Sequence, residues 1–361
     1  LEDTAPFEVC RGFATLLDEH GRPMHKSAGN SIPFDEGASI MSADAMRWLY
    51  TSHNPAANLR FGYKLAEEAR RRFMIPLWNV YSFFVIYANI DGFDPTANAM
   101  PVMERSSLDR WIIAELHDTI REVTEGLEHW DTAEGNHALE TFADNLSNWY
   151  VRRGRRRYWK SEEDTDKAAA YLTLYEVLTT LVRLLAPYTP FMAEALYQNL
   201  VRSVVPDAPE SVHLTGWPAA DAALIDRDLL AAVRLTRRVV GLGLAARNAG
   251  KVRVRQPLAR LRITTRDEAE WAALQPFVDQ ILDELNVKRL ERLTDESGVA
   301  SYTLRPVTPL LGPRLGARLP AAIKALNALD QSVAVATVRS GGSLALDVDG
   351  TEVVLAPEEV Q

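Results

Sequence analysis

Hydrophobic residues recur at helical spacing through the middle of the chain. After Ser106, apolar positions repeat every three or four residues, as expected when one face of an α-helix is buried; they are Leu108, Trp111, Ile112, Leu116, Ile120, Val123 and Leu127. The same spacing recurs over residues 132–159, 167–185 and 190–204, and a longer helix, bent or broken at Pro76, is expected over 62–90. The pattern predicts a bundle of helices over residues 62–205.

The pattern changes after a proline-containing connector, residues 206–225. Beyond it, helical and strand-like segments alternate; we expect helices over 226–249, 268–285 and 315–329, and strands over 258–264, 287–293, 302–307, 343–348 and 351–355. The last two strands flank Asp349-Gly350, a dipeptide typical of a two-residue hairpin turn. We therefore predict a small α/β domain over residues 226–361.

Ahead of the bundle lies a loop, GRPMHKSAGN over residues 21–30, followed by short helices that Asp35 and Ser42 can begin. A lysine and a serine between flexible residues are typical of a chain that wraps phosphate oxygens. The P-loop motif, however, requires Gly-x-x-x-x-Gly-Lys-Ser, and His20 and His25 stand where its glycines would be. That motif is excluded, and a solvated surface turn remains the alternative for Lys26 and Ser27.

Composition limits the class of protein. The chain has 361 residues, of which 47% are hydrophobic and 25% charged, as in a globular protein of two or three domains. A single cysteine, Cys10, indicates a reducing compartment, and the seven histidines show no metal-ligand spacing, so no metal site is predicted. The most apolar run, residues 74–90, is interrupted and falls short of the roughly 20 residues that span a membrane. A soluble, cytoplasmic protein is expected, and because the chain starts with Leu1 we expect a piece of a longer polypeptide.

Charge is unevenly distributed. The net charge of −9 disfavours a nucleic-acid partner, but residues 145–160 hold five arginines and one lysine without an acid, and residues 248–262 hold four arginines and one lysine without an acid. In the second window Lys251, Arg253 and Arg255 alternate with valines, so an extended segment would point all three cations one way. Such a ribbon could follow a phosphate backbone. The alternative, which the sequence favours equally, is that these cations only face the solvent.

The order of these features resembles the region from the KMSKS loop onward in class I aminoacyl-tRNA synthetases. The loop with Met24, Lys26 and Ser27 is followed by Gly29-Asn30, by the sequence DAMR at 44–47, and then by the predicted bundle. Two longer segments look like the anticodon-binding domain of the isoleucine, valine and leucine group: SNWYVRRGRRRYW at 147–159 and LAPYTPFMAEALY at 185–197. Four segments look most like isoleucyl-tRNA synthetases of the larger, eukaryote-like type: MHKSAGN at 24–30, KVRVRQPL at 251–258, LNVKRL at 285–290 and LGPRLG at 311–316.

The resemblance implies a mainly α fold with a smaller α/β part. Its expected parts are the end of a Rossmann-type catalytic domain with a KMSKS-like loop over 1–61, a helical anticodon-binding domain over 62–205, a connector over 206–225 and a C-terminal α/β tRNA-binding module over 226–361. The parent enzyme would use ATP with Mg²⁺ to join isoleucine to tRNA(Ile), as a monomer. A valyl-tRNA synthetase fragment and a stand-alone tRNA-binding protein are the alternatives.

The family's His-x-Gly-His signature and its editing domain do not occur in this sequence. We therefore expect this chain alone to be inactive and to bind no cofactor, and we expect the missing N-terminal catalytic and editing domains of the same polypeptide to be its partners.

The resemblance also implies site residues. The family loop usually reads Lys-Met-Ser-Lys-Ser, whereas Pro23 and His25 replace its first lysine and first serine here. Lys26 is expected to stabilise the charge that develops on the ATP phosphates in the transition state. Further ATP contacts are expected from Met24, His25, Ser27 and Gly29, although His25 could only shape the loop.

For tRNA, the implied contacts are the arginines of the first basic window and the ribbon of the second; they are Arg152, Arg153, Arg155, Arg156, Lys251, Arg253 and Arg255. On a regular helix Trp149, Arg153, Arg156 and Lys160 share one face, and Arg152, Arg155 and Trp159 share another. Aromatic rings beside these cations could stack on unpaired bases. The alternative is that rings pack into the bundle and some arginines pair with acids, and we favour tRNA contact for the arginines and core packing for the tryptophans.

Overall fold

A computed structural model describes residues 9–97, 99–159, 164–293 and 303–361 of the chain. It divides into two compact units, Leu1–Val233 and Arg234–Gln361. The fold is mainly helical, and each unit has a hydrophobic core of its own. Domain boundaries at residues 61, 205 and 225 remain predictions from the sequence.

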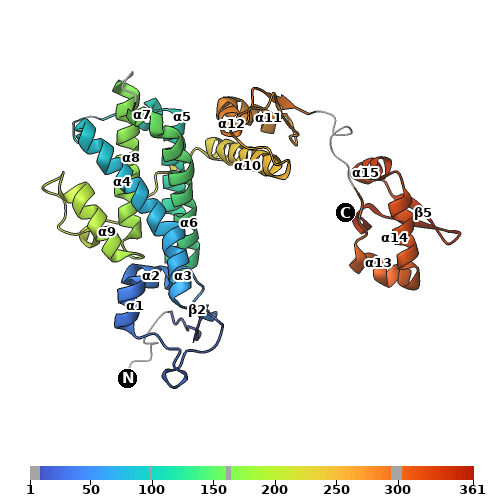
Figure 1. Ribbon diagram of the computed structural model, residues 1–361, viewed down its shortest axis with the longest axis horizontal. Coiled ribbons are helices and arrows are strands. Elements are labelled where there is room, and N and C mark those ends of the chain that lie inside the picture. The colour runs from blue at the N-terminus through green and yellow to red at the C-terminus, as the bar shows by residue number, and fades with distance from the viewer. Residues whose placement is uncertain (1–8, 98, 160–163, 294–302) are drawn as a thin grey trace, which may run out of the picture. The chain divides into compact units, whose positions relative to one another are not determined.

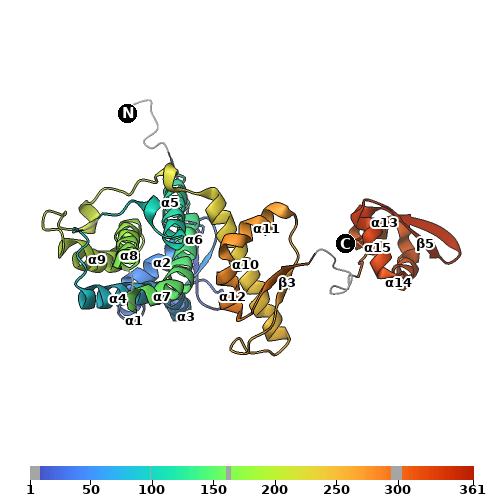
Figure 2. The same ribbon diagram turned by 90° about the horizontal axis from the view of Figure 1, so that it is seen from above.

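The first unit is a bundle of long helices. Its elements are α1 Phe34–Met41, α2 Ala43–Thr51, α3 Tyr63–Ala69, α4 Ile75–Asp91, α5 Ser107–Glu128, α6 Thr132–Asp144, α7 Arg152–Trp159, α8 Asp164–Leu185 and α9 Pro190–Tyr197. The helices α5, α6 and α8 run side by side and are seen nearly end-on in Figure 2. The short helices α1 to α3 lie at one end of the bundle and α7 at the other (Figure 1).

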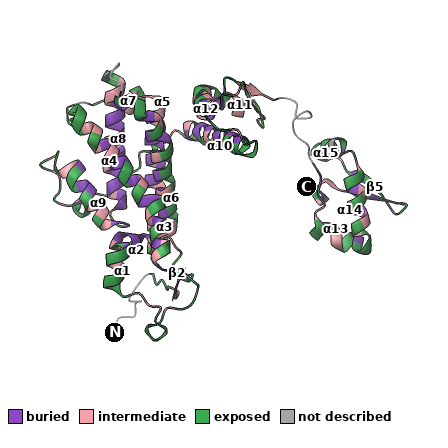
Figure 3. Ribbon diagram, viewed as in Figure 1, coloured by how far each residue is buried: buried purple, intermediate pink, exposed green. Residues whose placement is uncertain are grey.

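Buried residues lie on the inward faces of the long helices (Figure 3). Helix α5 is predicted from apolar spacing and begins where expected, because the Ser106 hydroxyl accepts a hydrogen bond from the Asp109 N–H. Its apolar positions Trp111, Ile112 and Leu116 are at most 1% exposed. At the end of the bundle formed by α1 to α3, the rings of Trp48 and Phe73 stack with centroids 3.8 Å apart.

Among the described residues of the bundle, three stretches are π-helical: Arg70–Met74, Asn145–Val151 and Gln198–Arg202. The first joins α3 directly to α4, so the helix continues past Pro76, which stands at the start of α4. A proline is tolerated there because the wider turn before it accommodates the missing N–H and the ring. The helix is therefore not broken at Pro76, contrary to the prediction, but continues through a local π-helical turn.

This continuity changes the length of the apolar helix. Residues Tyr63–Asp91 and Thr165–Leu185 are two stretches long and apolar enough to cross a membrane by length and composition alone, so the prediction that residues 74–90 fall short is wrong. In their most apolar windows, 33% of the first and 72% of the second is buried within the bundle. Core helices of soluble proteins meet the same criterion, which makes it weak evidence for a membrane span.

Near the N-terminus, two short strands pair in parallel: β1 Leu16–Leu17 lies beside β2 Leu59–Arg60, with Leu16 opposite Leu59. The loop of residues 21–30 follows β1 and folds back on it, since Leu17 and Pro23 form an antiparallel bridge. The loop therefore leaves and returns at the edge of this small sheet.

The second unit begins within the long helix α10 Arg227–Ala249. Its further elements are β3 Leu261–Ile263, α11 Glu268–Leu274, α12 Val278–Leu285, β4 Leu290–Arg292, α13 Thr308–Leu315, α14 Leu319–Ala328, α15 Gln331–Arg339, β5 Leu344–Val348 and β6 Thr351–Leu355. Strands β3 and β4 pair in parallel, and β5 and β6 form an antiparallel hairpin. The predicted hairpin turn is confirmed, with Asp349 and Gly350 both at positive φ.

Three expectations for this unit are wrong. The helix predicted over 268–285 is divided by a 3₁₀ turn, Gln275–Phe277, that contains Pro276. Helices α13 and α15 were not expected, and no strand forms over the described residues 303–307, where Pro306 makes only an isolated bridge to Val360; Tyr302 lies outside the described residues. Helix α13 forms despite Pro313 because Leu311 and Leu315 are buried in a cluster with the β5–β6 hairpin.

Candidate functional site

The loop of residues 21–30 presents an exposed tip. Lys26, Ser27 and Ala28 form a 3₁₀ turn that Gly29 ends in the left-handed region, at φ 68°. The side chains of His25, Lys26 and Ser27 are exposed, whereas Met24 is half-buried. Within the described part of the chain, the Lys26 ammonium makes neither a hydrogen bond nor an ion pair. The structure thus places the predicted ATP-contacting residues together on one free tip.

The base of this loop is fixed by Asp18, which is buried. Its carboxylate accepts hydrogen bonds from the main-chain N–H groups of His20 and Arg22, both at 2.9 Å, and from the Asn30 side-chain amide at 3.0 Å. Asn30 in turn accepts from the His25 N–H at 2.9 Å. The hydrogen bond from the Arg22 N–H, with that from Asn30, holds the pKa of Asp18 well below its usual range. Sequence reasoning missed Asp18, because a single acid before a glycine turn carries no distinctive signal.

The DAMR segment at 44–47 docks the loop region onto the bundle. The buried carboxylate of Asp44 accepts hydrogen bonds from the N–H groups of Phe191 and Met192, at 3.2 and 2.7 Å, where α9 begins. Arg47 donates to the Pro187 carbonyl at 2.7 Å. Burial raises the pKa of Asp44, but a carboxylate beside the N–H groups of a helix start is well placed. These residues join α2 to α9 and fix where the loop stands relative to the bundle.

The first basic window forms α7, at the end of the bundle away from the loop (Figure 1). Arg155 and Arg156 are exposed and bond to no described residue. The guanidinium groups of Arg152 and Arg153 lie 6.0 and 5.5 Å from the ring centre of Trp149, within reach of a cation–π interaction. Arg152 also donates to the Asn148 carbonyl at 2.9 Å.

The two tryptophans of this window differ. Trp149 is buried, at 4% exposure, as predicted, but Trp159 is 56% exposed, so the prediction of core packing is wrong for that residue. Its ring lies 6.3 Å from that of Tyr87, on the same helix as the exposed Arg155 and Arg156. Lys160, which was expected on the same face as Trp149, lies outside the described residues. An exposed indole on a helix with exposed arginines provides both a stacking surface and phosphate-reaching cations.

Arg157, from the same run of arginines, faces inward. Its guanidinium donates to both carboxylate oxygens of Asp109, at 2.8 and 2.7 Å, and to Asp166 at 2.7 Å. Tyr150 donates to the same Asp109 carboxylate at 2.6 Å. This arginine belongs to the structure of the bundle, as the alternative interpretation of the window anticipated for part of the run.

The second basic window is not extended. Lys251 has a positive φ of 55°, and the Gln256 N–H bonds to the Arg253 carbonyl at 3.0 Å, which closes a turn. Lys251, Arg253 and Arg255 are all exposed. The predicted ribbon, with cations on one side and valines on the other, is therefore wrong in its geometry, and Val254 is itself 43% exposed.

The shape of this turn is imposed by a buried arginine, Arg247, which is 6% exposed. Its guanidinium donates to the carbonyls of Leu285, Asn286 and Arg253, at 2.6, 3.1 and 3.1 Å. The Asn286 amide donates to the Val254 carbonyl at 3.0 Å. Arg247 thereby ties the basic turn to the end of α12, and sequence reasoning missed it because its acceptors are main-chain atoms far along the chain.

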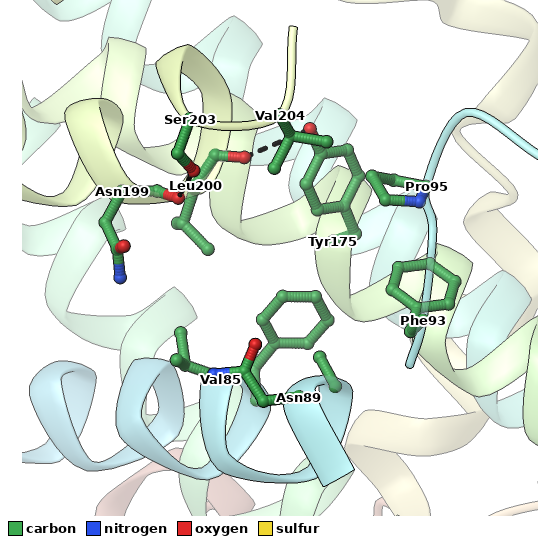
Figure 4. A pocket seen from close by; sticks show the side chains of 11 residues that line it. Val85, Asn89, Phe93, Pro95, Tyr175, Asn199, Leu200, Ser203 and Val204 are labelled. Atoms are coloured by element: carbon green, nitrogen blue, oxygen red, sulfur yellow. Dashed lines mark hydrogen bonds between the residues drawn. The ribbon is translucent and has the colours of Figure 1, made fainter. Parts of the chain in front are cut away.

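A small pocket of about 140 Å³ opens between α4, α8 and the π-helical stretch after α9 (Figure 4). Three aromatic rings form much of its wall, those of Phe84, Phe93 and Tyr175. The Tyr175 hydroxyl donates to the Leu200 carbonyl at 3.2 Å. Asn89 and Asn199 also line the pocket, and the Asn199 amide donates to the Tyr81 hydroxyl. An aromatic wall with a few polar groups suits a planar ring that carries hydrogen-bonding edges.

Comparison with known proteins covers nearly the whole chain. Residues 109–263 match the family model described as the anticodon-binding domain of tRNA ligase. An isoleucine–tRNA ligase of Thermus thermophilus is 44% identical over 354 residues, 98% of this chain and 34% of that protein. One of Clostridium novyi is 41% identical over 98% of this chain and 33% of that protein, and one of Dehalococcoides mccartyi is 48% identical over 78% and 28%.

The chain spans about a third of the length of these curated relatives. Among solved structures, a ternary complex of Agrobacterium radiobacter LeuRS with tRNA matches 78% of this chain and 32% of that one, with 14% identity and a TM-score of 0.46.

Proposed function

Because the chain belongs to the isoleucine–tRNA ligase family, we propose that it supplies two parts of such an enzyme, the lysine loop that meets ATP and a surface that holds tRNA(Ile). The observation that carries the proposal is the match to an anticodon-binding domain over residues 109–263. That stretch includes α7, where Arg155 and Arg156 are exposed and bond to no described residue. Exposed cations on a matched anticodon-binding domain fit contacts to tRNA phosphates.

The lysine loop acts in the first step of the reaction. The isoleucine carboxylate attacks the α-phosphate of ATP, pyrophosphate leaves, and negative charge grows on the phosphate oxygens. Lys26 stands on a free tip whose base is fixed through Asn30 and Asp18, so its ammonium can move to the phosphates as charge develops. Further contacts to ATP come from Met24, His25, Ser27 and Gly29. Mg²⁺ enters with the ATP, whose phosphate oxygens are the ligands it prefers.

The tRNA surface combines cations with a stacking ring. Arg152, Arg153, Arg155 and Arg156 reach phosphates, and the exposed ring of Trp159 offers a platform for an unpaired base. The basic turn of Lys251, Arg253 and Arg255 adds phosphate contacts in the second unit. The aromatic pocket beside Tyr175 receives an unstacked base of the same tRNA. The enzyme acts as a monomer in the cytoplasm, with the domains that carry the other ATP signature supplied by the same polypeptide.

Aminoacylation by the full-length protein tests this function. Purified tRNA(Ile) and tRNA(Val) are incubated with ATP and either isoleucine or valine, and the charged product is measured. We expect stable charging of tRNA(Ile) with isoleucine and little of tRNA(Val). Preferential charging of tRNA(Val) with valine, or no charging with either pair, would contradict the proposal.

A further inference from the structure

A shallow groove of about 390 Å³ opens where α8 ends. One wall is apolar, formed by Leu127 at the end of α5 and by Ala186 and Pro187 after α8. The other wall is the segment 212–217, which begins with the 3₁₀ turn Val212–Leu214. The polar groups that line the groove are Arg183, His213 and Thr215.

Arg183 is a half-buried cation that pairs with no acid among the described residues. In the part of the chain that the structure describes, its guanidinium makes no hydrogen bond and no ion pair, and burial lowers its pKa. Other shielded arginines of the bundle are paired: Arg105 lies 2.8 Å from Glu176, and Arg157 lies 2.7 Å from Asp109. Because a guanidinium that loses water normally gains an acceptor, the unpaired Arg183 indicates an anion that binds from outside.

The acid that contacts the start of this segment, Glu194, is already engaged. Glu194 accepts hydrogen bonds from the Ser211 hydroxyl at 2.8 Å, the Val212 N–H at 2.9 Å and the Gln198 amide at 2.7 Å. Its carboxylate therefore holds the turn in place and does not pair with Arg183. The positive charge of the groove remains available.

The opposite rim adds donors and a ring. Among the described residues, the main-chain N–H groups of Gly216 and Trp217 have no acceptor. The Trp217 indole is 41% exposed, and its ring nitrogen donates to the Thr124 hydroxyl at 2.9 Å, which fixes its orientation. A guanidinium, two free N–H groups and an oriented aromatic face are the groups that hold a phosphate and the sugar or base attached to it.

We propose that this groove binds a phosphate group, with Arg183 as its cation and Trp217 as the platform for the attached nucleoside. The phosphate belongs either to the tRNA backbone, in which case the inference rests on the proposed function, or to a free mononucleotide. The groove includes Pro187, whose carbonyl accepts from Arg47 of α2. Since α2 and α7 lie at opposite ends of the bundle (Figure 1), the groove is a contact separate from α7.

Binding of a tRNA(Ile) transcript and of adenosine monophosphate to this chain tests the proposal. The variant Arg183→Met removes the charge and keeps the apolar stem, and Arg71→Met, at an exposed arginine outside the groove, is the control for loss of one charge. We expect Arg183→Met to weaken tRNA binding about tenfold at low salt, the scale of one charge-assisted contact, and Arg71→Met to weaken it much less. Arg183→Lys should recover part of the affinity because a lysine restores charge without the two-point geometry.

A second pair of variants leaves Arg183 in place. A side chain at Gly216 meets no atom within 4 Å of its Cβ, so Gly216→Asp adds a carboxylate to the rim without disturbing packing, and Gly216→Asn is its neutral match. Only the aspartate should weaken binding. This pair remains informative if Arg183→Met unfolds the chain.

The two ligands separate the sources of the phosphate. If adenosine monophosphate binds and Arg183→Met abolishes that binding, the groove takes a mononucleotide, even if tRNA does not bind and the proposed function fails. If Arg183→Met and Gly216→Asp weaken the binding of tRNA but not that of adenosine monophosphate, the phosphate is that of tRNA. If neither ligand distinguishes the groove variants from their controls, the proposal is overturned.

Discussion

The guanidinium of Arg157 and the carboxylate of Asp109 form a two-point ion pair, with nitrogen–oxygen distances of 2.8 and 2.7 Å. Asp109 is fully buried, and the arginine side chain is 14% exposed. The pair links α5 to α7 at the end of the bundle that carries the candidate tRNA surface. One arginine of the basic run therefore holds the helix in place from within while its neighbours face solvent.

Replacing Arg157 should destabilise the bundle strongly. The variant Arg157→Leu leaves the Asp109 charge buried without its partner, and we expect it to lower the free energy of unfolding by about 3–5 kcal/mol. Urea titration followed by circular dichroism measures this change. Arg156→Leu is the matched control, and since that side chain is exposed it should cost less than about 0.5 kcal/mol. Equal effects of the two variants would show that the ion pair does not stabilise the fold.

The same pair predicts a dependence on pH. Burial alone would raise the pKa of Asp109, but hydrogen bonds from Arg157 and Tyr150 outweigh it, so the folded-state pKa lies below the unfolded value. A depressed carboxylate pKa contributes stability above the unfolded pKa of about 3.9, and this contribution is lost as the pH falls through the folded pKa.

The variant Arg157→Leu should reverse this behaviour. Without the arginine, burial raises the pKa of Asp109, so the stability difference from wild type should be largest at pH 7 and shrink toward pH 4 as Asp109 takes up a proton. Unfolding measured at both values checks this. A difference that stays constant would mean that Asp109 is not the titrating group.

Lys26 should affect chemistry and not stability. In the full-length enzyme, Lys26→Ala should slow adenylate formation by roughly 100-fold or more, the scale of one lost transition-state contact, with a smaller change in the KM for ATP. Because the side chain is exposed and bonds to no described residue, Tm should not move. Pyrophosphate exchange at the wild-type kcat would remove Lys26 from the mechanism.

The anchor of the loop can be separated from its tip. Asp18→Ala removes the acceptor of Asn30 and of two main-chain N–H groups, so the tip is less well positioned. We expect a reduced kcat for adenylate formation, and faster proteolysis of residues 21–30, whereas Lys26→Ala should leave proteolysis unchanged. Equal proteolysis of Asp18→Ala and wild type would contradict the anchoring role.

The basic surfaces are tested by salt. Each phosphate contact contributes about 0.9 to the slope of log affinity against log salt on duplex nucleic acid, and about 0.7 on single strands. Replacing Arg155 and Arg156 by serine should therefore reduce the slope by the contribution of up to about two phosphate contacts. Replacing Lys251, Arg253 and Arg255 by serine should reduce it by the contribution of up to about three. tRNA binding by this chain over a salt series measures both. An unchanged slope for either variant would identify that surface as a solvated face.

The sequence pattern predicted the structure correctly where residues of a single helix or turn determine it. The apolar spacing of α5 and its Ser106 cap, and the Asp349-Gly350 turn, are predicted and found. The sequence pattern failed where contacts with residues far along the chain determine which way a side chain points. Arg155, Arg156 and Arg157 are equivalent in the sequence, and only the position of Asp109, 48 residues away, turns the third inward.

The basic turn of the second unit shows the same limit. Alternating valines and cations favour an extended strand, but Arg247 binds the carbonyl of Arg253 together with two carbonyls at the end of α12. These contacts bend the segment, and they involve main-chain atoms that no side-chain pattern encodes. The α13 helix likewise forms against local propensity because its leucines enter a core built from the distant hairpin.

The π-helical stretch Asn145–Val151 changes which side chains of the following helix α7 face the solvent. Each residue of an α-helix advances the side chain by about 100° around the axis, so the extra residue of a wide turn rotates everything after it. The Arg153 guanidinium still lies 5.5 Å from the Trp149 ring, but further along the helix Tyr158 turns inward while Trp159 turns out. Deleting one residue from this stretch would leave the composition of the basic helix intact and turn its side chains by about 100° around the axis, so that a different set would face the solvent.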